Sequence, residues 1–356
     1  MAQGKKRLRT FIICLLATVG VIAAGCFTVN CLVDPLWYLG GNVLTKINYP
    51  FNERLAKIIR FVPRMADYDC VIFGTSRATL LPENEVKGYR CYNLAVSDGQ
   101  VGEWLSYADY LRQRGFAPKL MLVELKRGDL VGPLPKPEVP DFVRSGGSPP
   151  SILISYLSLD ALDFSIRTLQ GDAPHHRYYD ADFGAQLEKR SKRHYYNPAG
   201  AIKPMEPPTD VHPERAEQYI ALRQKFPTAR AIGFVPPESA WRMASFSLTD
   251  GFGEYLGAVA RIAAAYDVFL DFSIPTKLTE SKSPNDTYDG IHYSRAVNGK
   301  VLAALLADKT DLALDWRAED ATAASARYRG LLSDFMTTLA QAEASPQKEK
   351  AAPNTN

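Results

Sequence analysis

Hydrophobic positions along the chain first form one unbroken run and then a repeating alternation of short apolar and polar stretches. Residues 11–33 are uncharged and mostly apolar, which is long enough for a helix that crosses a bilayer. Asp34 and Pro35 end the run, and residues 4–9 before it are rich in Lys and Arg. Basic residues on the amino side predict that this end stays in the cytoplasm and that the remainder crosses the membrane.

Two interpretations of this segment stay open. A signal peptide would be cleaved near residues 23–25, where small side chains suit a peptidase, whereas an anchor would be retained. We favour the retained anchor because the apolar run continues past these residues. The predicted organisation is then a cytoplasmic tail over 1–10, a transmembrane signal anchor over 11–33 and a connector over 34–66. The chain would be a single-pass protein of the inner (cytoplasmic) membrane with a periplasmic domain.

The alternation that follows predicts a folded α/β domain over residues 67–343, with a disordered tail over 344–356. Continuous apolar runs of strand length are typical of parallel strands buried on both faces. Helices with one apolar face separate them. Strands and helices in alternation predict a doubly wound, mostly parallel five-stranded sheet. The five predicted strands are 70–73, 90–96, 120–125, 230–235 and 268–272. The main predicted helices are 101–114, 255–266, a closing helix that starts at 293 or 294, and 321–342.

A long segment over 131–228 interrupts the alternation, and we expect it to be an insertion with its own helices over 152–169. Paired tyrosines beside Arg and His occur at 174–179 and 189–196. Such tyrosines stack on sugar rings or pack the insertion onto the core, and packing is the more common role. His175 and its neighbour His176 lack the acidic or Cys partners of a metal site, so no metal is expected.

Composition narrows the class of protein. With 42 basic and 39 acidic residues the net charge is +3, which is too small to indicate a nucleic-acid partner. A hydrophobic fraction of 46% is that of a globular protein with a real core. Cys70 and Cys91 each begin a predicted strand, so these two thiols either pair in an oxidising compartment or stay buried and free.

The turn after the first strand carries the first candidate for chemistry. Gly74, Thr75 and Ser76 follow the apolar run and open what we expect to be a helix. At the carboxyl end of a parallel strand, Ser76 would expose its hydroxyl near a helix N-terminus, which suits a nucleophile and a developing oxyanion. Alternatively, Thr75 or Ser76 serves only as the helix N-cap.

The second candidate lies in the polar loop after the last apolar strand. Asp289 precedes His292 by three residues, with Gly290 between them. A serine hydroxyl needs an imidazole to accept its proton, and a carboxylate holds the other ring nitrogen of that imidazole. A solvated loop histidine is the alternative. Because both Ser76 and His292 follow strands of one predicted sheet, we expect them to meet at its carboxyl edge.

An apolar strand into Gly-Thr-Ser76, together with a late Asp289-x-x-His292 before a closing helix, resembles the SGNH (GDSL-like) hydrolase superfamily over residues 70–306. The Gly-Thr-Ser-Arg form on a membrane anchor is similar to envelope members, including relatives of the alginate O-acetylation proteins and the teichoic acid D-alanyl transfer protein. The resemblance implies Ser76 as nucleophile, His292 as base and Asp289 as its orienting partner. It also places an oxyanion donor near Gly99.

Three further features bear on the site. Arg77 either meets an anionic substrate or pairs with a local carboxylate such as Asp98, and we favour the pair. Asn93 ends the second strand and either reaches the active site or caps a turn. The family's Asn-bearing block has no clear match, because residues 126–129 read Lys-Arg-Gly-Asp in its place.

The resemblance implies an extracytoplasmic esterase or O-acyltransferase that acts on acyl esters, with acetyl the expected group, of an envelope or exported polysaccharide. The anchor and the missing Asn favour transfer. The expected partners are an acylated glycan or acyl donor, the membrane, and a membrane acyltransferase as a candidate; no cofactor is expected. The alternative is an inactive glycan-binding or assembly subunit that keeps the fold.

Overall fold

A computed structural model describes the chain over residues 2–172, 177–181, 183–187, 196–198, 202–307 and 311–344. The chain divides into two compact units, of which the first comprises residues 1–67, 109–116 and 138–190, and the second 68–108, 117–137 and 191–356.

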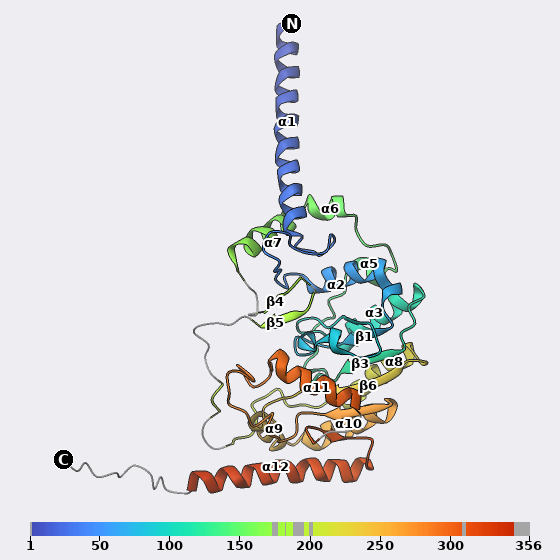
Figure 1. Ribbon diagram of the computed structural model, residues 1–356, viewed down its shortest axis with the longest axis vertical. Coiled ribbons are helices and arrows are strands. Elements are labelled where there is room, and N and C mark those ends of the chain that lie inside the picture. Colours follow the sequence, from blue (N-terminus) through green and yellow to red (C-terminus); the bar gives the residue numbers. More distant parts are fainter. Residues whose placement is uncertain are drawn as a thin grey trace, which may run out of the picture. The chain divides into compact units, whose positions relative to one another are not determined.

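The second unit is built on a mostly parallel sheet with strand order β2-β1-β3-β6-β7-β8 (Figure 1). The α/β class and the five parallel strands agree with the sequence, but the prediction of a five-stranded sheet was wrong. A sixth strand, β8, pairs antiparallel with β7. With two residues, β8 is too short to form a recognisable pattern. The strands are β1 (Cys70–Phe73), β2 (Cys91–Asn93), β3 (Leu120–Glu124), β6 (Arg230–Val235), β7 (Val268–Asp271) and β8 (Leu314–Asp315).

One face of this sheet packs against helix α11 (Arg295–Ala307). Alternate strand residues such as Ile72 and Leu122 form a buried cluster with Val301 and Leu305 of that helix. This packing covers one face of the strands, and their carboxyl ends are left to carry polar side chains. The other helices with residues in the unit are α3 (Val101–Gln113), α4 (Arg127–Leu130), α8 (Ala216–Lys225), α9 (Ala240–Ser247), α10 (Phe252–Ala265) and α12 (Ala321–Ala344).

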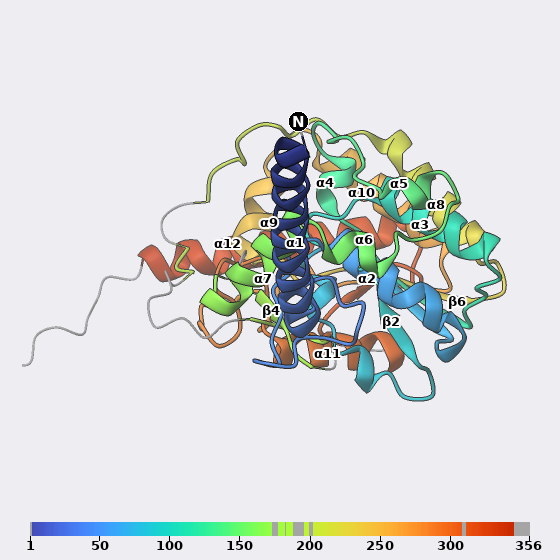
Figure 2. The same cartoon turned by 90° about the horizontal axis from the view of Figure 1, so that it is seen from above.

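The first unit contains α1 (Ala2–Val33), which ends where the sequence predicted. Among the described residues, Gln3–Val33 is the one helix long and apolar enough to cross a membrane, a property that signal sequences share. Two helices from the expected insertion lie beside its carboxyl end (Figures 1 and 2). They are α6 (Ile152–Tyr156) and α7 (Leu159–Gln170), which together account for the helical spacing predicted over 152–169.

The remaining elements of this unit are short. They are α2 (Glu53–Phe61), α5 (Asp141–Arg144), and the antiparallel pair β4 (Arg177–Tyr179) and β5 (Ala185–Leu187). Tyr179 is buried and donates a hydrogen bond to Glu53, so this tyrosine has the packing role. His175, His176 and the basic stretch 189–195 lie outside the described residues.

A buried polar network fixes the carboxyl end of α1. Asn30 Nδ2 donates to the backbone oxygen of Tyr156 at 2.8 Å, and Ser165 Oγ donates to Asn30 Oδ1 at 2.8 Å. The carboxylate of Asp34 accepts a hydrogen bond from the Tyr156 hydroxyl and two more from backbone N–H groups of the following loop. Since buried polar groups are costly unless paired, this network determines how α1 enters the unit.

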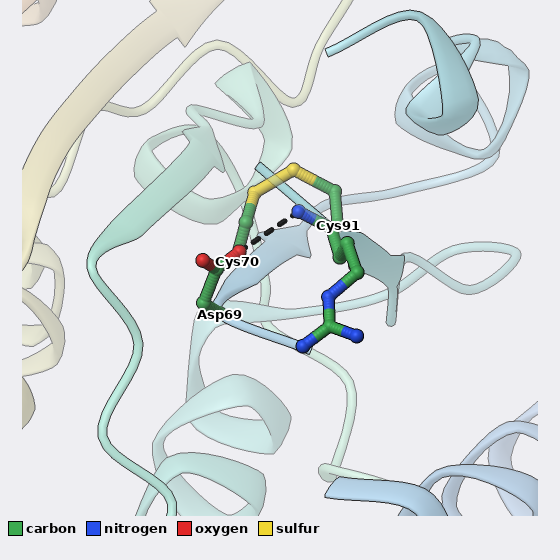
Figure 3. The surroundings of a disulfide bond; sticks show 4 residues. Asp69, Cys70 and Cys91 are labelled. Atoms are coloured by element: carbon green, nitrogen blue, oxygen red, sulfur yellow. Dashed lines mark hydrogen bonds between the residues drawn. A yellow bond between two sulfur atoms is a disulfide. The ribbon is translucent and has the colours of Figure 1, made fainter. Parts of the chain in front are cut away.

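Cys70 and Cys91 form a disulfide, which is the first of the two alternatives that the sequence left open (Figure 3). The two residues are paired in register on the parallel strands β1 and β2, with Cα atoms 4.2 Å apart. Asp69 beside them accepts a hydrogen bond from the backbone N–H of Arg90 at 2.8 Å. The bridge joins the starts of the two strands, at the opposite end of β1 from Ser76.

Candidate active site

Ser76 lies in the turn that follows β1, as the sequence predicted, but the expected α-helix after it was wrong. A 3₁₀ turn over Ala78–Leu80 follows instead, and a second 3₁₀ turn lies over Glu83–Glu85. Pro82 disfavours helical backbone at the preceding residue, and Leu81 is accordingly extended at φ −64°, ψ 131°. The N-cap of the short turn is Arg77, with no side-chain cap. The N-cap role considered for Thr75 and Ser76 is therefore absent here.

Glu124 holds this turn in place from the carboxyl end of β3. Its side chain is fully buried, and its Oε2 accepts the backbone N–H groups of Thr75 at 2.8 Å and Ala78 at 3.2 Å. Its Oε1 accepts the Thr75 hydroxyl at 2.7 Å and lies 2.7 Å from Arg77 Nη2. Gly74 makes this close approach possible, because a Cβ at that position would lie 2.8 Å from Glu124 Oε2. The carboxylate thus takes the place of a helix in satisfying the backbone.

The three residues predicted for nucleophilic chemistry meet in one hydrogen-bonded chain. Ser76 Oγ lies 2.8 Å from His292 Nε2, and His292 Nδ1 lies 2.6 Å from Asp289 Oδ2. A carboxylate only accepts hydrogen bonds, so Nδ1 carries the proton and Nε2 is left to accept the proton of the serine hydroxyl. This is the arrangement that a general base needs in order to activate a serine.

The loop that carries His292 is held by its own hydrogen bonds. Asp289 Oδ1 accepts the backbone N–H of His292 at 2.7 Å, while the Thr287 hydroxyl donates to the backbone oxygen of His292 at 2.8 Å. Gly290 takes φ 77°, a conformation that favours glycine. Burial alone would raise the pKa of Asp289, but hydrogen bonds and the charge of His292 lower this pKa below its usual value. Asp289 therefore stays ionised as a partner for the imidazole.

Ser76 and His292 line a pocket of about 220 Å³ whose wall is unusually rich in charge. Four cationic and two anionic side chains contribute to it, so the lining is positive overall. The charged lining residues are Arg77, Lys126, Arg127 and Arg242, with Asp98 and Glu238. The other residues of the wall are Thr75, Gly128 and Ile291.

Glu238 organises three of these cations from a buried position after β6. Its Oε1 lies 2.6 Å from Arg127 Nη2 and 3.1 Å from Arg242 Nε, and its Oε2 lies 3.9 Å from Arg77 Nη1. Burial by itself would raise the pKa of Glu238, but the charges of Arg127, Arg77 and Arg242 lower it to about 2. The carboxylate remains ionised and keeps the guanidinium groups at the pocket wall.

Arg77 has the paired role that we favoured, but the partner expected was wrong. Arg77 pairs with Glu124 and approaches Glu238, whereas Asp98 pairs with Lys126 at 2.5 Å. The reason is that Arg77 is nearly buried, at 10% side-chain exposure, and faces the carboxylates of the strand ends.

Gly99 and Asn93 both make hydrogen bonds within the fold. The N–H of Gly99, expected to stabilise an oxyanion, donates to the backbone oxygen of Val96 at 3.0 Å. A Cβ on Gly99 would lie 2.8 Å from the backbone oxygen of Gly74, so glycine permits the two turns to approach. Asn93 Nδ2 donates to the backbone oxygen of Ala78 at 2.9 Å, and its Oδ1 accepts the N–H of Ala95 at 3.0 Å, which is the turn-capping role.

The sequence did not identify three residues of the candidate site, which are Glu124, Glu238 and Arg242. Glu124 ends an apolar strand, and Glu238 follows another by three residues. A charged residue at the carboxyl end of a buried parallel strand is itself a signal, and it was present in both cases. Arg242, on α9, has no such marker. Within the described residues, no group of three His, Cys, Asp or Glu side chains is arranged to hold a metal ion.

No protein-family model matches the chain, and comparison with the curated proteins finds no relative.

Proposed function

We propose that the protein is an SGNH-like serine esterase or O-acyltransferase that acts on acyl esters, with acetyl the expected group, of an envelope or exported polysaccharide. The observation that carries this proposal is the continuous hydrogen-bonded chain from Asp289 through His292 to Ser76. Such a chain has a direct chemical use in acyl transfer, because it activates a hydroxyl near neutral pH.

In the proposed first step, His292 Nε2 accepts the proton of Ser76 Oγ as the oxygen attacks the acyl carbonyl. The imidazolium, stabilised by Asp289, then donates that proton to the departing sugar oxygen as the carbon–oxygen bond breaks. The acyl group is left on Ser76. Water or a second hydroxyl attacks it in the reverse sequence, which gives hydrolysis or transfer, respectively.

The charged pocket wall supports stabilisation of the negative oxygen that develops during attack. Lys126 and Arg127 line the pocket beside Ser76 and His292. Preorganised cations in a partly closed site stabilise such charge without reorganisation. We infer that this wall takes the role that the resemblance gave to Gly99.

A second pocket beside the first supports a glycan as substrate. It measures about 630 Å³, includes the aromatic side chains Tyr196 and Trp241, and shares Arg242 with the Ser76 pocket. Aromatic rings with neighbouring polar groups are a common surface for sugar rings. We propose that a neighbouring sugar residue binds there while the reacting ester or hydroxyl lies at Ser76.

The proposed location is the outer side of the cytoplasmic membrane, with α1 as a retained anchor. The amino end of α1 is basic, which favours a cytoplasmic position for it. The Cys70–Cys91 disulfide is typical of an oxidising compartment.

The alternative is a glycan-binding or assembly subunit that retains the fold without turnover. The observation in its favour is the engaged N–H of Gly99, which removes the expected oxyanion donor. A glycan pocket without covalent chemistry at Ser76 would be its signature.

Acylation of Ser76 tests the proposal directly. The full-length protein in mild detergent would be treated with a fluorescent serine-directed phosphonate and with a chromogenic acetyl ester. We expect stoichiometric labelling of the wild type, none of Ser76→Ala, and a rate lower by about 10³-fold or more for His292→Ala. Ser106→Ala, which changes a serine bonded within its own helix, is the matched control and should label normally.

If the folded wild type neither labels nor hydrolyses the ester, catalysis at Ser76 is excluded. Retained binding of an acetylated polysaccharide under those conditions would establish the alternative. Adding glycan acceptors to the labelled reaction would separate transfer from hydrolysis, since only a transferase yields acylated glycan.

A further inference from the structure

The first unit contains a pocket of about 630 Å³ that the proposed chemistry does not use. Its wall is mainly apolar and aromatic and comes from the loop after α1, from α2 and the turn after it, and from the start of α6. The lining residues are Trp37, Tyr38, Leu39, Gly40, Ile59, Arg60, Val62, Pro63, Arg64, Pro149, Pro150, Ser151 and Ile152. An apolar cavity of this size accommodates a hydrocarbon chain.

Arg60 gives the pocket a specific polar group. Its guanidinium carbon lies 5.1 Å from the ring centroid of Trp37 and 5.1 Å from that of Phe183. Contacts of this kind use the face of the guanidinium and leave its in-plane N–H donors available. Within the described part of the chain, the Arg60 side chain has neither a hydrogen bond nor an ion pair. The arrangement therefore holds a positive charge in position for an anion.

The position of the pocket along the membrane normal follows from the network at the end of α1. About 20 helical residues span the hydrocarbon core of a bilayer, so a span that begins at residue 11 ends near residue 30. Asn30 and Asp34 are bonded to Tyr156 of α6, and Ser165 of α7 is bonded to Asn30. These bonds place α6 and the loop after α1 at the level where the helix leaves the hydrocarbon.

This unit exposes large apolar side chains, which is unfavourable in water. Ile154 of α6 is 70% exposed and Leu159 of α7 is 77% exposed. Outside α1, the other large apolar side chains described in this unit that are more than half exposed are Leu39, Val43, Leu44 and Leu153. Exposed apolar side chains in the unit that contains a membrane-spanning helix are typical of contact with the acyl boundary of a bilayer.

We propose that this pocket binds one membrane phospholipid, with an acyl chain against the apolar wall and the phosphate on Arg60. The occupant is a lipid because the wall includes the loop that follows α1. In addition, Arg60, which is the one cation of the described lining without an ion pair, complements a phosphate. This inference does not depend on the proposed reaction, which belongs to the other unit.

Lipid retention tests the proposal on the full-length chain. The protein would be reconstituted with phosphatidylglycerol, extracted in mild detergent and examined by native mass spectrometry during stepwise delipidation. We expect one retained lipid per wild-type chain and retention at least about tenfold lower for Arg60→Gln. Arg329→Gln is the matched control, because Arg329 lies 5.1 Å from the ring of Phe252 in the other unit. It should retain lipid as the wild type does.

Equal retention by wild type and Arg60→Gln would overturn the proposal. So would displacement of the bound species by inorganic phosphate alone, which would indicate a site for soluble anions. Thermal unfolding of both arginine variants would verify that each is folded.

A second measurement keeps Arg60 intact. With Cys14, Cys26 and Cys31 replaced by Ala, spin labels would be placed at Ile154 and, as control, at Leu248, which is 43% exposed on the other unit. In lipid vesicles that contain no other protein, we expect the label at 154 to collide with oxygen more than with a water-soluble nickel complex. We expect the label at 248 to do the reverse. Equal access of nickel at both positions would instead indicate that position 154 faces water. Protection at 154 only in native membranes would indicate that a protein partner covers it.

Discussion

The two units each bury a carboxylate at a critical position, and the partners of these carboxylates differ. Glu238 in the second unit lies among Arg127, Arg242 and Arg77, which lower its pKa to about 2. Asp34 in the first unit accepts hydrogen bonds from neutral donors, the Tyr156 hydroxyl and backbone N–H groups. Burial raises the pKa of Asp34 more than these bonds lower it.

The difference shows that nearby charge, rather than burial alone, decides the direction in which the pKa of a buried acid shifts. In the second unit the charge is retained and serves to position three guanidinium groups beside Ser76. In the first unit the carboxylate acts as an acceptor that fixes the direction of a helix. The network of Glu238 sets the charge of the pocket wall, and the network of Asp34 fixes the carboxyl end of α1.

Removing the charge of Glu238 should have the largest effect. In Glu238→Gln the three arginines lose their common partner, and breaking a buried ion pair in this way costs about 3–5 kcal/mol. We expect the free energy of unfolding in urea to fall by that amount and labelling of Ser76 to slow. Glu217→Gln is the control, because Glu217 pairs with Arg261 on the surface at 64% exposure and should cost about 1 kcal/mol or less. Equal losses in both variants would mean that the pairing of Glu238 contributes little.

Tyr156→Phe should have an intermediate effect. It removes the hydroxyl that donates to Asp34 and leaves a buried oxygen without that bond, at a cost of about 1–3 kcal/mol. Urea unfolding of the full-length protein in detergent would measure the loss. Tyr178→Phe is the control, since the half-buried Tyr178 hydroxyl has no hydrogen bond among the described residues, and it should change stability by less than about 0.5 kcal/mol. An unchanged free energy of unfolding in Tyr156→Phe would show that packing alone holds the carboxyl end of α1.

Asp129 sharpens the comparison because it is a buried acid in the same unit as Glu238, but its hydrogen-bond donors are mostly neutral. Its Oδ2 accepts the N–H of Val101 at 3.0 Å and the hydroxyl of Tyr219 at 2.9 Å. Burial raises its pKa to about 6, although the charge of Lys126 opposes the rise. The folded state therefore binds its proton more tightly than the unfolded state, and stability falls as the pH rises from about 4 to 6.

Asp129→Asn keeps an acceptor for both hydrogen bonds and removes this titration. Relative to wild type, the variant should gain about 1–3 kcal/mol of unfolding free energy between pH 4 and pH 7. Urea unfolding at the two pH values provides the measurement. A stability difference that does not change with pH would contradict the raised pKa.

The features that the sequence predicted well are local ones. The apolar runs of β1, β3 and β6 identify buried parallel strands without reference to the rest of the chain. The spacing of Asp289 and His292 in one loop is likewise local, and the carboxyl edge of a parallel sheet brings Ser76 to them.

The features that were missed depend on distant partners. No pattern near Ser76 shows that Glu124, 48 positions later, binds the turn, so a helix was expected where a carboxylate satisfies the backbone. Arg77 was assigned to Asp98, which is closer along the chain than Glu124 and Glu238. The association of residues 138–190 with the first unit also rests on long-range contacts such as that between Asn30 and Tyr156.

The Cys70–Cys91 bridge has a consequence for strand pairing. β2 lies at the edge of the sheet and has three residues, so its hydrogen bonds alone hold it weakly against sliding along β1. A covalent link at the first paired position excludes every other register. It also keeps β2 from detaching and exposing β1 as a free edge, which is the kind of surface on which a second chain adds a strand. The bridge thus acts as a safeguard against strand exchange between molecules, and it does so at the opposite end of β1 from Ser76.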